Sequence, residues 1–153
     1  MTIRYDKKVQ TITITVGYDM LTTTTKITSE QAEATENVKD QAVRLMEYAA
    51  VYPNNEVVFH KSNMDLIVQS DASYLSRSKA RSVAGGVMYF GDRENPKVLH
   101  GAVHCVSVII DVVVSSVGEA EYGSTFINGK QAENLRTIST AMGHPSTDTQ
   151  SMR

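Results

Sequence analysis

The chain has 153 residues, 41% of them apolar, which suits one globular domain, or one and a fraction, and excludes a disordered tail. Its 15 Lys and Arg against 17 Asp and Glu give a net charge of −2, which excludes a strongly basic protein that coats nucleic acid and does not support a polybasic membrane binder. The single cysteine, Cys105, cannot form an internal disulfide, and no stretch reads as a signal peptide or membrane span, so we expect an intracellular location.

The first 28 residues carry weak signals. Residues 11–16 (TITITV) alternate threonine with branched apolar residues and predict a half-exposed strand. The threonine tract at 22–25 disfavours a helix, because branched side chains lose rotamer freedom there.

A helix is predicted over residues 35–52. Residues 28–31 (TSEQ) fit a capping box, and Thr35 offers a second start before an acidic first turn. Apolar residues then recur at helical spacing on one face: Val38, Ala42, Leu45, Met46 and Ala49. The Pro-Asn-Asn sequence at 53–55 predicts a turn that ends the helix.

Strand-like runs rich in branched residues follow this helix. They are residues 56–59, 64–72, 83–90 and 98–114. A polar turn at 60–63, a polar loop at 73–82 and a hairpin-like connection at 91–96 separate them. Gly85-Gly86 predicts a bulge or a close approach of another backbone.

A last helix is predicted from Ser116, which forms a capping box with Glu119, to a Gly-His-Pro stop at 143–145. Its expected buried stripe is Val117, Ala120, Ser124, Ile127, Leu135, Ile138 and Met142. The fold class predicted from this order is α+β: an N-terminal helix, an antiparallel three-stranded meander and then a long helix.

Two carboxylates are candidates for chemistry. Asp71 lies where an apolar run meets the polar loop, so it either faces a cleft or starts a turn. Glu119 has a capping role, whereas Glu121 has none and lies at the edge of the buried stripe. The helix dipole also stabilises a negative charge at both positions, which is a structural reason for their presence. One Asp and one Glu can hold a divalent cation, but a two-metal site usually needs three or four carboxylates.

Three motifs, in this order, resemble the ribonuclease H domain of Copia-type retrotransposon Pol polyproteins. They are residues 70–75 (SDASYL), residues 79–86 (KARSVAGG) and residues 115–122 (SSVGEAEY). Residues 29–52 resemble the stretch that joins reverse transcriptase to ribonuclease H. The resemblance covers about residues 28–145 and implies two parts, a degraded polymerase end at 1–54 and a partial ribonuclease H-like domain at 55–153.

This resemblance implies a mixed five-stranded sheet with flanking helices, and cleavage of the RNA strand of RNA·DNA hybrids by two Mg²⁺ or Mn²⁺ ions. By position it makes Asp71 and Glu121 the catalytic metal ligands. It also favours phosphate contact for residues of the loop after Asp71, which otherwise reads as a solvated turn. These nucleic-acid contact residues are Ser73, Arg77, Lys79 and Arg81.

The chain departs from the family after its last helix. There the family has a fourth strand with a third carboxylate, whereas Asp148 follows the helix stop with no predicted strand between them. We therefore expect a truncated or decayed copy with weak or no activity. The alternative is a non-catalytic ribonuclease H-like module that binds nucleic acid or associates with itself through an exposed sheet edge, without a membrane partner.

Overall fold

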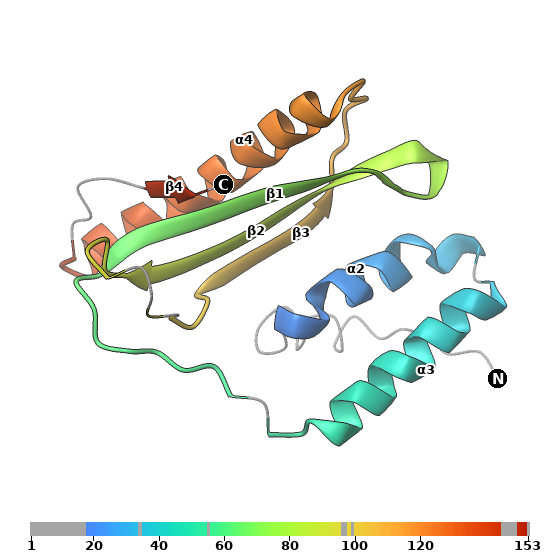
Figure 1. Cartoon of the computed structure of the whole chain (residues 1–153), viewed down its shortest axis with the longest axis horizontal. Helices are drawn as coiled ribbons and strands as arrows, with labels where there is room; N and C mark the ends of the chain where they lie inside the picture. The colour runs from blue at the N-terminus through green and yellow to red at the C-terminus, as the bar shows by residue number, and fades with distance from the viewer. Residues whose placement is uncertain are drawn as a thin grey trace. The chain divides into compact units, whose positions relative to one another are not determined.

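A computed structural model describes residues 18–33, 35–54, 56–95, 98, 100–144 and 150–152. The strand predicted at 11–16 lies outside these residues, as does Asp148. The chain divides into two compact units, Met1–Val57 and Val58–Arg153 (Figure 1). The division at 54/55 that the resemblance implies remains a prediction. No helix in the described residues has the length and apolar character to cross a membrane.

The first unit holds two α-helices, α2 (Leu21–Ser29) and α3 (Glu36–Val51), with short 3₁₀ turns at Tyr18–Met20 and Gln31–Glu33. Helix α2 runs through the threonine tract, so the prediction against a helix there is wrong. Thr24 is buried and donates its hydroxyl proton to the Met20 carbonyl at 2.9 Å. Ile27 is buried in a cluster with three α3 residues, Val38, Ala42 and Leu45. Tertiary burial therefore outweighs the low helix propensity of threonine.

Helix α3 confirms the helix predicted over 35–52. Its N-cap is Thr35, whose side chain accepts the Val38 amide proton at 3.4 Å, while the alternative capping box at 28–31 is wrong because α2 continues to Ser29. Met46, which the helical spacing predicts on the buried face, is 62% exposed. The face that packs on α2 is narrower than the apolar pattern indicates.

The second unit is a mixed sheet with one long helix. Its strands are β1 (Asp65–Arg77), β2 (Arg81–Gly91), β3 (His104–Ile109) and β4 (Gln150–Met152), in the order β3-β2-β1-β4. The pairs β1/β2 and β2/β3 are antiparallel, which confirms the meander and the α+β class, and β4 is parallel to β1. The sequence did not indicate β4. Residues 56–59 form no strand, so that prediction is wrong. Among the described residues of the 98–114 run only β3 is a strand, so that prediction is confirmed in part.

Helix α4 (Val117–Ala141) covers one face of the sheet (Figure 1). The core between them is a cluster of buried side chains: Leu66, Val68, Met88, Val106 and Ala132. The stripe that α4 buries is made of small and polar residues: Ala120, Ser124, Asn128, Ala132 and Ser139. Val117, Ile138 and Met142, expected in the stripe, are exposed, because the helix contacts the sheet along a narrow line.

The capping signal at the start of α4 and the glycine signal at its end are confirmed, whereas Pro145 of the predicted stop lies outside the described residues. The Ser116 hydroxyl accepts the Glu119 amide proton at 3.2 Å. At the other end the Gly143 and His144 amides donate to the carbonyls of Thr140 and Ser139, the paired bonds of a Schellman motif. Gly143 has φ +89°, a left-handed conformation that glycine adopts without strain.

Candidate functional site

Asp71 lies in the middle of β1, opposite Gly85 of β2, and not at a strand end as predicted. The predicted polar loop at 73–82 is instead the rest of β1, a short turn at Ser78–Ala80 and the start of β2. The strand continues because Ala72 and Tyr74 alternate with exposed polar residues and pack against the cluster around Ala84. Local polarity indicated a loop, whereas burial of alternate side chains makes it a strand.

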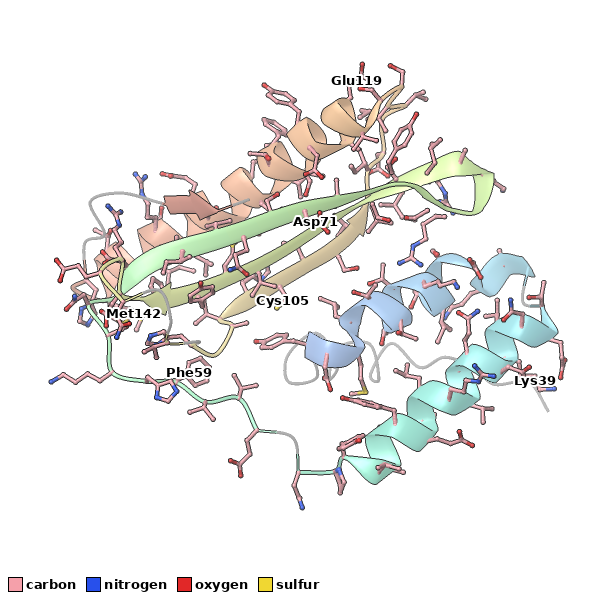
Figure 2. The ribbon with its side chains drawn as sticks, viewed as in Figure 1. Lys39, Phe59, Asp71, Cys105, Glu119 and Met142 are labelled. Atoms are coloured by element: carbon pink, nitrogen blue, oxygen red, sulfur yellow. The ribbon has the colours of Figure 1, made fainter. Side chains whose placement is uncertain are left out.

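The Asp71 side chain is exposed and lies on the sheet face away from α4. Its neighbours show the direction: Ser70 bonds to two α4 side chains, and Ala72 packs against the cluster that includes Ala120 of α4. Since successive strand residues point to opposite faces, Asp71 points the other way. Figure 2 labels it on the ribbon of β1.

The two glutamates at the start of α4 have different surroundings. The Glu119 carboxylate accepts the Ser115 amide proton at 2.7 Å and the Ser115 hydroxyl proton at 2.9 Å, and these bonds lower its pKa below the usual 4.5. This confirms a capping role for Glu119. Glu121 is half-buried, and its main-chain carbonyl accepts the Thr125 hydroxyl proton at 2.9 Å.

A buried polar network joins the start of α4 to the middle of the sheet. The Ser124 hydroxyl, completely buried, donates to the Asp71 carbonyl at 2.5 Å. The amide nitrogen of Asn128, also buried, donates to the Gly85 carbonyl at 2.8 Å and lies 2.9 Å from the Ser70 hydroxyl oxygen. Glu121 precedes Ser124 by about one helical turn. The bond from Ser124 to the Asp71 carbonyl therefore holds the turn of α4 that contains Glu121 near the middle of β1.

Sequence reasoning placed Ser124 on the stripe but missed Asn128. The sequence does indicate the position of Asn128, because it follows Ser124 by four residues and therefore lies on the same helix face. The pair Gly85-Gly86 indicates where on the sheet a side chain such as Asn128 can approach. A Cβ on Gly86 would lie 1.9 Å from the Asn128 Oδ1, so a group does approach this glycine closely, but it is a side chain and not another backbone. The pairing register runs through Gly85 and Gly86 without the alternative bulge.

The predicted nucleic-acid contact residues lie toward the tip of the β1–β2 hairpin. Arg77 and Arg81 are directly opposite each other, and Lys79 is exposed in the turn between them with φ +61°. Ser73 is exposed and nearer to Asp71, on β1. Arg77 follows Asp71 by six positions on β1, and the pairing register of β1 with β2 shifts between Ser73 and Arg77.

The described residues do not assemble a two-metal centre. Among them no group of three or more His, Cys, Asp or Glu side chains is placed to hold a metal ion. Asp71 points away from the helix that carries Glu121, so these two carboxylates alone do not surround one cation. We therefore derive no hydrolytic step from this arrangement.

Comparison with known proteins found no matching family model, no matching curated protein and no matching solved structure.

Proposed function

We propose that the chain derives from the ribonuclease H region of a Copia-type retrotransposon Pol polyprotein and has weak or no hydrolytic activity itself. The ancestral reaction is cleavage of the RNA strand of RNA·DNA hybrids, in the cytoplasm or a retroelement particle. The proposal is supported by the three motifs in their order and by the mixed sheet, which is the kind of sheet that the resemblance implies.

One observation carries this proposal. The Ser124 hydroxyl bonds to the Asp71 carbonyl, so the first turns of α4 lie against the middle of β1. This bond holds the helix that carries Glu121 against the strand that carries Asp71, 50 positions earlier in the sequence. The expected loss of activity has a physical reason, because two-metal hydrolysis needs several carboxylates around one site and the described residues bring fewer together.

A cleavage assay on a labelled RNA·DNA hybrid with Mg²⁺ or Mn²⁺ tests the proposal. We expect cleavage no faster than the buffer control, both for the natural chain and for Asp71→Asn and Glu121→Gln. Robust cleavage that both substitutions abolish would overturn the expected inactivity and establish the two residues as ligands. Robust cleavage that neither substitution changes would reject the site assignment.

The hairpin tip favours a second candidate function, binding of an RNA·DNA hybrid without cleavage. Three cationic residues gather there within five positions, Arg77, Lys79 and Arg81. Cations held at one tip contact phosphates without reading sequence, and each contact adds to the salt dependence of binding.

Fluorescence anisotropy with a labelled hybrid at several salt concentrations tests this second function. Lys79→Gln should weaken binding and reduce the slope of log affinity against log salt by about 1. Lys61→Gln removes an exposed lysine outside the tip and serves as the matched control. Equal effects of the two substitutions would contradict a contact surface at the tip.

We also propose that the chain associates with itself beside β3, which is an edge of the described sheet. Val112 and Val113 follow this strand closely, and Val113 is completely exposed. Apolar residues beside a sheet edge favour pairing with a second copy. Light scattering after size exclusion should show a dimer that Val113→Lys dissociates; a monomeric natural chain would refute this.

A further inference from the structure

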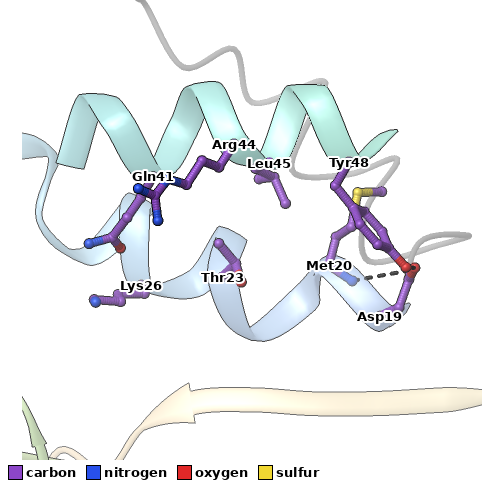
Figure 3. Close-up of a pocket in the computed structure, with 8 residues that line it drawn as sticks. All are labelled: Asp19, Met20, Thr23, Lys26, Gln41, Arg44, Leu45 and Tyr48. Atoms are coloured by element: carbon purple, nitrogen blue, oxygen red, sulfur yellow. Dashed lines mark hydrogen bonds between the residues drawn. The ribbon is translucent and has the colours of Figure 1, made fainter. Parts of the chain in front are cut away.

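The first unit contains a groove between α2 and α3 that includes none of the candidate site residues in the sheet and α4. Its volume is about 510 Å³, within the range of about 300–1,000 Å³ typical of small-molecule sites. Figure 3 shows the residues that line it: Asp19, Met20, Thr23, Lys26, Gln41, Arg44, Leu45 and Tyr48. All of them lie within Met1–Val57, so the groove belongs to one compact unit.

One end of the groove has an apolar wall and a hydrogen bond between two of its polar lining residues, Tyr48 and Asp19. Leu45 is buried and Met20 packs against the same cluster of side chains, which provides apolar surface. The Tyr48 hydroxyl donates to the Asp19 carboxylate at 2.6 Å, and Asp19 also accepts the Met20 amide proton at 3.1 Å. The only carboxylate among the described lining residues is therefore already hydrogen-bonded.

The other end of the groove is cationic. Figure 3 shows Lys26, Gln41 and Arg44 at the end away from Asp19 and Tyr48. Within the described part of the chain neither Lys26 nor Arg44 forms a salt bridge, whereas other cations do: Lys39 with Glu36, Arg93 with Asp65 and Arg136 with Glu133. Because both cations line the same groove, an anion bound at this end would be attracted by two positive charges.

We propose that this groove binds a small organic phosphate. The phosphate group lies between Lys26 and Arg44, and an apolar or aromatic body lies against Leu45 and Met20. The planar guanidinium of Arg44 suits a phosphate because it donates two parallel hydrogen bonds, and the Lys26 ammonium supplies a second charge. The site uses neither Asp71 nor Glu121, so it stands independently of the function proposed above.

Charge favours a small ligand over a nucleic-acid strand. The unit that holds the groove, Met1–Val57, contains eight Asp and Glu against six Lys and Arg. A long polyanion would meet net repulsion from this part of the chain, whereas a single phosphate meets the two cations directly.

Isothermal titration of the 153-residue chain with phenyl phosphate tests the proposal. We expect saturable binding that Arg44→Gln and Lys26→Gln each weaken by about tenfold. Lys39→Gln is the matched control, because Lys39 is on α3 but pairs with Glu36 and does not line the groove. Circular dichroism melting of each variant establishes that the fold is intact.

Two further ligands make the test specific. Benzyl alcohol has an aromatic body without the charge, and inorganic phosphate has the charge without the body; both should bind at least tenfold more weakly than phenyl phosphate. Binding that Arg44→Gln leaves unchanged, or equal binding of benzyl alcohol, would overturn the cationic site. Equal binding of inorganic phosphate would overturn the role given to Leu45 and Met20.

Discussion

Gly86 and Asn128 fill the same small space between β2 and α4. Because a Cβ on Gly86 would lie 1.9 Å from Asn128 Oδ1, Gly86→Ala must displace a buried side chain that makes several hydrogen bonds. We expect Gly86→Ala to lower the free energy of unfolding by about 1–3 kcal/mol, measured by urea denaturation.

Gly85→Ala is the matched control, since its Cβ would meet only the Asp71 carbonyl oxygen at 3.7 Å, an ordinary contact. Its effect should stay within about 0.5 kcal/mol. In an Asn128→Ala background the cost of Gly86→Ala should shrink, because the obstructing amide is gone. Equal losses at the two glycines would show that the close approach does not constrain the chain.

Glu119 should make stability depend on pH. The Ser115 amide and hydroxyl lower the Glu119 pKa, so the carboxylate binds these donors more strongly when charged. A lowered pKa stabilises the fold above the unfolded value of 4.5, and this stabilisation is lost as the pH falls through the folded value. Urea midpoints of the natural chain and Glu119→Gln should therefore differ at pH 7 and converge toward pH 3. A difference that stays constant over this range would contradict the assignment.

Two glycines, Gly129 within α4 and Gly143 just beyond its end, should respond to replacement by alanine in opposite directions. Gly129 lies within the helix with nothing within 4 Å of an added Cβ, so Gly129→Ala should raise the free energy of unfolding by about 0.5–1 kcal/mol. Gly143 ends the helix with φ +89°, so Gly143→Ala should lower it by about 1 kcal/mol. Thermal melting by circular dichroism measures both. Changes of the same sign would contradict the interpretation of one of these positions.

Helix α2 shows how an element can form against its local propensity. Thr24 and Thr28 each donate to a carbonyl four residues earlier, and Thr24 and Ile27 bury their side chains. The prediction failed because propensity is a difference of tenths of a kcal/mol per residue, whereas burial of a side chain contributes more.

At the scale of the whole molecule, the segment between the helices of the first unit and β1 is the expected site of proteolysis. Residues 56–64 form neither helix nor strand (Figure 1). Lys61, among them, is exposed. Among the described residues, trypsin should cut first after Lys61, because exposed irregular backbone fits a protease more easily than a helix does. Mass spectrometry identifies the fragments, and Lys61→Gln should remove this early cut. First cleavage at Lys130, within α4, would contradict the description of the segment.

The sequence alone determined the helix ends and the helices and strands that have a regular apolar pattern. Thr35 and Ser116 have side chains that satisfy helix amides, Gly143 adopts the conformation that ends a helix, and α3 and β2 have regular apolar patterns. These features could be predicted because each depends on residues within a turn or a strand of one another. Gly86 is similar, since only glycine tolerates another group so near its Cα.

Tertiary structure decided what depends on distant partners. It extended β1 beyond Asp71, because Tyr74 packs on a cluster supplied by β2 and α4, and it placed Asp71 within the strand facing away from the helix. It also set Asn128 against Gly86, 42 positions earlier in the sequence, and arranged Lys26 and Arg44 around one groove. No local pattern carries this information, because which side chains meet is fixed only when helices and strands pack together.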